Sequence, residues 1–294
     1  MIGPLTLVAS LAFTLGGAAS APREVEFPFD DAQRLLPGET DAGKVWRSHG
    51  LPTDGRAVPL VVFVHGIIFD GKRHHWLTED RNGPWDARPF MDSLVDSGEI
   101  APLVVAVPSQ TRDATDPSKL FVGLDFDAFV AAVDGALAPL QKVDRSRIVV
   151  IGHSGSACEP GRAAMAALDA KTFTPRALLA VDGCFAPSTA PLLARTERAR
   201  DVIVTYQEQI WERPIAEFRA RWSAELERAW PHGQRVLERF EPGGENPHLA
   251  IVEATARRWL PVLLPPVDGV AWPARARTSI TAQLPSLPSP SMLL

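Results

Sequence analysis

Short apolar runs alternate with helical patterns along most of this chain, and that alternation restricts its fold more than any other feature. The apolar runs cover residues 58–64, 102–108, 147–151, 176–181 and 202–206, and a last strand is expected within 234–240. Runs that are apolar throughout are typical of parallel strands covered on both faces. The stretches between them, such as 126–140, carry the spacing of amphipathic helices. The sequence therefore predicts an α/β fold: a doubly wound, mainly parallel sheet with helices on both faces.

Polar residues directly follow several of these predicted strands. They are His65, Ser109, Ser154, Asp182 and Glu208. In open α/β sheets, ligands bind outside the carboxyl ends of the strands. We therefore expect these strand ends to build the functional site.

The turn Gly152-His153-Ser154-Gly155-Ser156 follows the third apolar run and precedes a helical pattern. A serine on such a tight strand-to-helix turn is strained, with its hydroxyl exposed above the sheet. Small residues two positions away on each side let neighbouring backbones pass close by. Ser156 takes the place of the usual last glycine and is small enough for this geometry. We predict that Ser154 is a catalytic nucleophile, rather than part of a Gly-Ser turn of no catalytic meaning.

A nucleophilic serine needs a base, because a free hydroxyl attacks poorly near neutral pH. His248 lies between the last predicted strand and a closing helix at 249–263, the place of the base in chain order. His65 is expected to shape a loop, and His153 to point off the other side of the serine turn. His74 and His75 lie in a polar loop with Asp70 and Glu79, whose spacing does not support the alternative of a metal site, and His49 and His232 lack a supporting context. We therefore predict His248 as the general base.

Two carboxylates are candidates for the acid that orients this base. Asp182 ends an apolar strand abruptly, and a buried carboxylate is costly unless it is paired, so His248 is its expected partner. Glu208 follows the next strand, where the acid more often lies in this architecture. Its polar neighbours also fit a solvated surface carboxylate. We predict Asp182 as the acid, with Glu208 as the alternative.

The two cysteines follow these site residues closely. Cys158 lies shortly after Ser154, and Cys184 shortly after Asp182. If the two strands are neighbours, a Cys158–Cys184 disulfide would hold the Asp182 loop beside the serine turn; it requires Cα atoms within about 7 Å. The alternative is a pair of buried free thiols that pack as small hydrophobic groups.

Backbone N–H groups are expected to stabilise the oxyanion of a tetrahedral intermediate. Gly155, directly after the nucleophile, should provide one donor. The second should come from the loop after the first apolar run, with the N–H of Ile67 as the candidate. Gly66 permits the backbone turn that this loop needs.

Three features together resemble the α/β-hydrolases, over roughly residues 59–264: His65-Gly66 after a strand, the Gly-His-Ser-Gly turn, and a histidine before the last helix. The resemblance implies an esterase, lipase, amidase, peptidase or lyase, and neither a metal nor an organic cofactor. The chain departs from the family pattern at Ser156. It also has no clear aspartate after the strand 202–206.

We predict a serine hydrolase that cleaves carboxylic esters through an acyl-enzyme, with a small-molecule ester or amide as substrate. A serine peptidase or amidase with the same machinery is one alternative, and a catalytically inactive binding protein on this fold is another. The net charge of −5 and the lack of a basic cluster with interleaved aromatics argue against a nucleic-acid partner. The amphipathic segment from Ile210 to Trp230 is interpreted as a helix packed on the sheet rather than a lid.

The N-terminus predicts export to a secreted or periplasmic location. An apolar run from Leu5 to Leu15 precedes the small-residue pattern Ala19-Ser20-Ala21, so residues 1–21 are assigned to a signal peptide. No Lys or Arg precedes the run, and a membrane anchor or a misassigned start are the alternatives. The run is short for a bilayer, which needs about 20 apolar residues, so stable membrane insertion is not expected. Residues 22–266 are predicted to form the hydrolase domain, and 267–294 a mobile tail with Pro and Ser.

Overall fold

A computed structural model describes residues 22–29, 34–67, 73–78, 86–112, 115–210, 212–228, 232–244 and 246–266. The predicted signal peptide (1–21) and the predicted tail (267–294) lie outside these ranges. Within them, no helix has the length and apolar character needed to cross a membrane.

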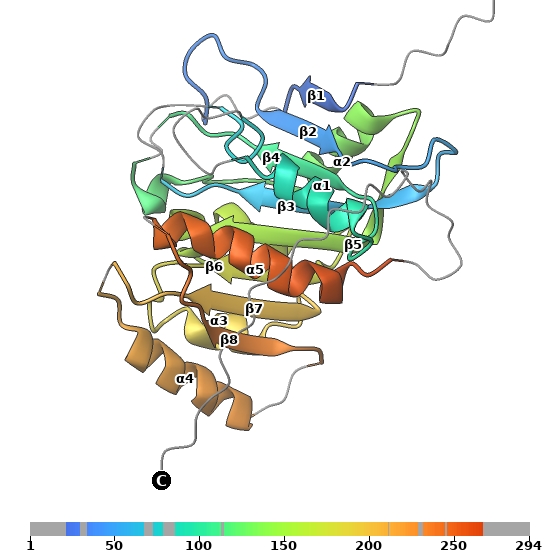
Figure 1. Cartoon of the computed structure of the whole chain (residues 1–294). Helices are drawn as coiled ribbons and strands as arrows, with labels where there is room; N and C mark the ends of the chain where they lie inside the picture. The colour runs from blue at the N-terminus through green and yellow to red at the C-terminus, as the bar shows by residue number, and fades with distance from the viewer. Residues whose placement is uncertain are drawn as a thin grey trace, which may run out of the picture.

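The described strands form one eight-stranded sheet in the order β1-β2-β4-β3-β5-β6-β7-β8 (Figure 1). β2 pairs antiparallel with both β1 and β4, and all the remaining neighbours pair parallel. This confirms the predicted α/β fold with a mainly parallel sheet. The strands are β1 (Glu24–Phe27), β2 (Gly43–Arg47), β3 (Ala57–Val64), β4 (Val104–Pro108), β5 (Lys142–His153), β6 (Ala177–Val181), β7 (Asp201–Tyr206) and β8 (Arg235–Arg239).

Helices cover both faces of the sheet. On the face turned to the viewer in Figure 1 lie α1 (Arg88–Asp96) and α5 (Pro247–Leu263). The other face packs against α2 (Phe126–Leu137), α3 (Ala190–Arg195) and α4 (Ile215–Arg228). Three short 3-10 helices complete the described elements: η1 (Pro117–Lys119), η2 (Ser154–Ala157) and η3 (Ala163–Asp169).

Strand β3 shows why its sequence is apolar at every position. Successive side chains of a strand point to opposite faces of the sheet. Val61 and Phe63 pack in the hydrophobic cluster of α1 and α5, whereas Val62 and Val64 pack in the cluster of α2 and η3. All four are fully buried. Continuous apolarity is thus the consequence of a sheet with no solvent-facing side at its centre.

The strand register brings the polar strand ends together at one edge of the sheet. Val64 of β3 pairs with Gly152 of β5, and His153 of β5 pairs with Val181 of β6. The residues that follow these pairs leave the sheet at the same level, because parallel strands end at a common edge. His65, Ser154 and Asp182 therefore lie side by side at the ends of β3, β5 and β6, three neighbouring strands at the centre of the sheet.

Candidate active site

Ser154 occupies the sharp turn between β5 and η2. Its φ of +57° is in the left-handed region, which costs a residue with a Cβ about 1–2 kcal/mol. Gly152 makes the turn possible, since a Cβ at this position would lie 2.4 Å from the Cβ of Ala164. The predicted strand-turn-helix context of the serine is therefore present, with a short 3-10 helix after the turn.

Ser156, the departure from the usual glycine pattern, is accommodated by its hydroxyl. The side chain is fully buried, and its Oγ lies 2.7 Å from the carbonyl oxygen of Val64 and 2.9 Å from that of His153. The single proton of the hydroxyl is thus shared between backbone acceptors at the ends of β3 and β5. The Ser156 side chain, which a glycine would lack, therefore links the serine turn to the end of β3 by a hydrogen bond.

The loop after β3 lies directly against the serine turn. A Cβ on Gly66 would be 2.7 Å from both the Cβ of Ser154 and the carbonyl oxygen of His153, so no side chain fits there. A Cβ on Gly155 would be 3.5 Å from the backbone nitrogen of Ile67. The two predicted oxyanion donors, Ile67 and Gly155, therefore belong to neighbouring backbone segments.

His65 fixes the orientation of this loop. Its ring is buried, and Nε2 accepts a hydrogen bond from the backbone N–H of Gln110 at 3.2 Å. The proton of the neutral ring is therefore on Nδ1, which donates to the carbonyl oxygen of Gly66 at 2.7 Å. That carbonyl shares a planar peptide with the N–H of Ile67, so holding one end of the peptide orients the other.

His248 and Asp182 form a close hydrogen bond. Nδ1 of His248, in the first turn of α5, donates to Oδ2 of Asp182 at 2.6 Å. The side chain of Asp182 is fully buried. Burial raises the pKa of this carboxyl, but hydrogen bonds from His248 and Gln207 and the charge of Arg213 outweigh it, so the pKa is lowered overall. Asp182 is therefore a carboxylate in contact with the histidine.

The alternative acid, Glu208, has a different environment. Glu208 follows β7, which lies beside β8, the last strand of the sheet. The carboxylate of Glu208 is exposed and pairs with Arg239 at 3.0 Å. The structure thus brings Asp182, and not Glu208, to Nδ1 of His248.

His153 has a contact that sequence reasoning missed. Its Nε2 lies 2.8 Å from the carbonyl oxygen of His248, and the two ring centroids are 4.2 Å apart. Burial lowers the pKa of His153 to about 3, so the ring is neutral and Nε2 is a donor. No local pattern reveals this contact, because it depends on α5 returning to the end of β5.

The expected disulfide between Cys158 and Cys184 is present, with Cα atoms 5.0 Å apart. Cys158 follows η2, and Cys184 belongs to the turn after β6 that begins with Asp182. The bond therefore links the serine turn covalently to the turn that carries the carboxylate.

The segment from Ile210 to Trp230 contains α4, which packs into the core. Phe218 and Trp222 are buried, and Phe218 contacts the ring of Phe185 edge-on. This agrees with the interpretation of a helix packed on the sheet. Trp211 and Trp230 lie outside the described residues.

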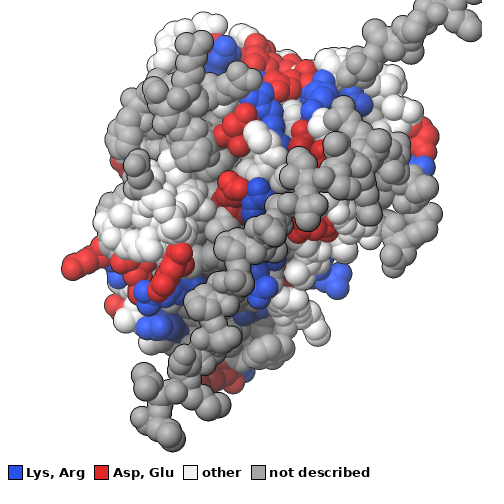
Figure 2. Space-filling view, in the orientation of Figure 1, with Lys and Arg blue, Asp and Glu red and all other residues white. Residues whose placement is uncertain are grey.

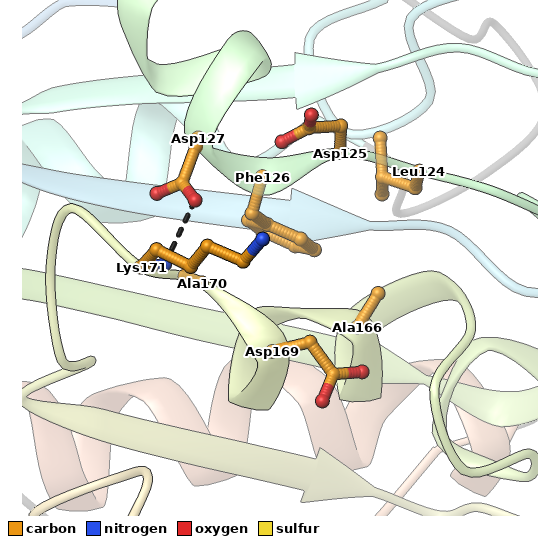
Figure 3. Close-up of a pocket in the computed structure, with 8 residues that line it drawn as sticks. All are labelled: Leu124, Asp125, Phe126, Asp127, Ala166, Asp169, Ala170 and Lys171. Carbon is orange, nitrogen blue, oxygen red and sulfur yellow. Dashed lines mark hydrogen bonds between the residues drawn. The ribbon is translucent and has the colours of Figure 1, made fainter.

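A separate pocket of about 270 Å³ opens between the start of α2 and the end of η3 (Figure 3). Asp127 in its wall accepts hydrogen bonds from the backbone of Lys171 and Thr172. None of the residues gathered around Ser154 lines it. The pocket is lined by Leu124, Asp125, Phe126, Asp127, Ala166, Asp169, Ala170 and Lys171.

In the described ranges, no group of three or more His, Cys, Asp or Glu could hold a metal ion.

The sheet order, the helices on both faces and the serine turn after β5 define an α/β-hydrolase fold. The sequence matches the alpha/beta hydrolase family over residues 61–294, and the chain belongs to this family. The protein is thus a member of a hydrolase superfamily. No curated protein matches it in sequence.

Solved structures share the fold at low sequence identity. An uncharacterised protein from Capnocytophaga ochracea has a TM-score of 0.50 and 11% identity, over 82% of this chain and 65% of that one, slightly less than two thirds of its length. A ferulic acid esterase from Anaeromyces mucronatus has a TM-score of 0.48 and 12% identity, over 85% and 93%. A fluorophosphonate-binding serine hydrolase from Staphylococcus aureus has a TM-score of 0.45 and 10% identity, over 82% and 97%.

Replacing Gly66 with Ala tests the close approach of the β3 loop. The new Cβ would collide with backbone and Cβ atoms of the serine turn, so we expect Gly66→Ala to lower the free energy of unfolding by about 1–3 kcal/mol. Gly135→Ala in α2 is the control, because no atom lies within 4 Å of its added Cβ. Denaturant titration measures both. Equal stability of Gly66→Ala and wild type would contradict the close approach.

The buried His153 predicts a loss of stability in acid. Its pKa is about 3 in the folded protein against a usual 6.5, so only the unfolded chain takes up the proton between these values. The contribution of the neutral His153 to the free energy of unfolding is therefore complete above pH 6.5, and it falls by up to about 1.4 kcal/mol per pH unit below that value. Unfolding at pH 7.5 and 5.0 should show a smaller loss in His153→Gln than in wild type. The exposed His232→Gln is the control, and an unchanged pH dependence in His153→Gln would refute the assignment.

Removing the disulfide should destabilise the fold. The bond closes a loop with a sequence separation of 26, for which the loss of chain entropy in the unfolded state predicts about 3.5 kcal/mol. We expect Cys158→Ala, Cys184→Ala and the double variant to lose similar stability, since each lacks the same bond. Denaturant titration with and without reductant measures this, and a wild-type midpoint unaffected by reduction would contradict it.

Proposed function

We propose that this protein is a serine hydrolase that cleaves carboxylic esters through an acyl-enzyme, with Ser154, His248 and Asp182 as its triad. The single observation that carries the proposal is the 2.6 Å hydrogen bond from His248 to the buried carboxylate of Asp182 beside the Ser154 turn. A carboxylate on Nδ1 holds the imidazole in the tautomer that leaves Nε2 free of a proton and able to act as a base.

In the proposed reaction, Oγ of Ser154 attacks the ester carbonyl while its proton passes to Nε2 of His248. The negative oxygen of the tetrahedral intermediate is stabilised by the backbone N–H groups of Ile67 and Gly155. Collapse of the intermediate breaks the bond to the alkoxy group, which takes the proton from His248 and leaves as an alcohol. Water then attacks the acyl-enzyme by the same route and releases the acid. Asp182 stabilises the imidazolium in both halves.

The arrangement of the loop supports this oxyanion role. The hydrogen bond from His65 to the Gly66 carbonyl keeps the peptide that carries the Ile67 N–H from turning over. Preorganised donors of this kind need no rearrangement as charge develops, and one donor is worth about 3–4 kcal/mol in comparable enzymes. The nearness of Gly155 to Ile67 suits two donors aimed at one oxygen.

A small-molecule substrate is part of the proposal. The net charge is −5, and basic and acidic side chains of described residues are interspersed on the face seen in Figure 2. Such a surface does not favour a polyanionic partner. We further propose a secreted or periplasmic location, supported by the cleavage pattern at residues 19–21 and by the disulfide, which persists in oxidising compartments.

Labelling with a fluorophosphonate probe tests the proposed nucleophile. Wild-type protein should be labelled, Ser154→Ala should not, and His248→Ala should be labelled far more slowly because the hydroxyl loses its base. Ester hydrolysis should fall at least about 10⁴-fold in both variants. Asp182→Asn should also be strongly impaired, whereas Glu208→Gln should stay near wild type because Glu208 pairs at the surface with Arg239.

The controls are Ser146→Ala and His232→Ala, which replace a serine and a histidine away from the site. Labelling that persists in Ser154→Ala would refute the assigned nucleophile. A folded wild-type protein that resists the probe would favour a non-catalytic binding protein instead. A panel of matched esters and amides then separates an esterase from an amidase or peptidase, since the triad serves both reactions.

A further inference from the structure

Arg213 forms a buried ion pair with the proposed triad acid. It lies two residues before α4, and its side chain is 9% exposed. Nη2 is 2.7 Å from Oδ1 of Asp182, while Oδ2 of the same carboxylate accepts the hydrogen bond from His248. The carboxylate therefore lies between two groups, one of them a permanent cation.

The same guanidinium holds the backbone around Asp182. Nη1 lies 3.1 Å from the carbonyl oxygen of Asp182 and 3.0 Å from that of Gly183, and Nη2 lies 2.8 Å from the carbonyl oxygen of Gln207. The group also stands over the ring of Phe185, 5.2 Å from its centroid. Only a planar group with several fixed donors can serve the carboxylate and these carbonyls together.

We propose that Arg213 is a positioning residue that holds the Asp182 turn and weakens the proton affinity of His248 by neutralising part of the charge of Asp182. The inference rests on the proposed triad. During catalysis His248 becomes an imidazolium, which the negative Asp182 stabilises and the positive Arg213 disfavours. The acid limb of activity is therefore expected at a lower pH than with an unpaired carboxylate beside the base.

Asp182, which follows β6, and His153, which ends β5, contact His248 directly. Arg213, which precedes α4, lies on the other side of the Asp182 carboxylate and acts on His248 through it. His153 stays neutral down to a pH of about 3, because burial lowers its pKa to that value. Above that pH, the charges beside His248 that the proposal invokes are those of Asp182 and Arg213.

The test is the pH dependence of the fluorophosphonate labelling rate and of kcat/KM for p-nitrophenyl acetate. Arg213→Met removes the charge, so the imidazolium becomes more stable and the acid limb should move to higher pH by about 1 unit. Arg213→Lys keeps the charge but loses carbonyl contacts, so its limb should stay at the wild-type pH while the plateau rate falls. Arg221→Met is the matched control, since Arg221 is exposed on α4 and pairs with Glu217 one turn earlier in the helix.

Rates are normalised at each pH to the folded fraction measured by circular dichroism, because acid lowers the stability of the fold and would otherwise move the limb of a weakened variant. A midpoint at the wild-type pH in this variant would overturn the inference. If Arg213→Met does not fold, Arg213→Lys decides: an unshifted limb with a lower plateau supports the inference, and a shifted limb or an unchanged plateau contradicts it. Failure of the proposed function is distinguishable, because then wild type is not labelled or Ser154→Ala still is.

Discussion

The close approach of the β3 loop to the turn after β5 is the constraint on which the rest of the site depends. β3 and β5 are parallel neighbours with Val64 opposite Gly152, so the segments that follow them occupy the same small space. Gly66 has room for no side chain beside Ser154. This contact places the backbone of Ile67 next to the serine turn. The proposed oxyanion donors and the Ser154 hydroxyl are thus brought together by the pairing of β3 with β5.

The turn after β6 is the second unit of the site, and tertiary contacts hold it in shape. Asp182 and Phe185 both have φ values near +50°, which cost residues with a Cβ about 1–2 kcal/mol each. The disulfide through Cys184 and the hydrogen bonds of Arg213 oppose relaxation of this turn. They also connect it to the serine turn and to the segment before α4.

Much of this arrangement could be predicted from the sequence, and the limits have physical causes. The serine turn is recognisable because its small residues are adjacent in the chain. The choice between Asp182 and Glu208 as the partner of His248 could not be settled from the sequence. It depends on the pairing of β8 with β7, which places Arg239 beside Glu208. Arg213 has no signal at all, because a contact across 31 residues of chain leaves no periodic pattern.

The sequence by itself determined the class of fold, the strand that Ser154 follows and the closing helix, which the structure begins at Pro247 so that His248 lies in its first turn. These follow from local patterns: continuous apolarity, helical spacing and small residues at a turn. Only the tertiary structure decided that Asp182 faces His248, that His153 donates to the His248 carbonyl, and that a buried cation lies on the far side of the carboxylate. Each of these contacts joins segments far apart in the chain, and their geometry exists only once the sheet has set the register of its strands.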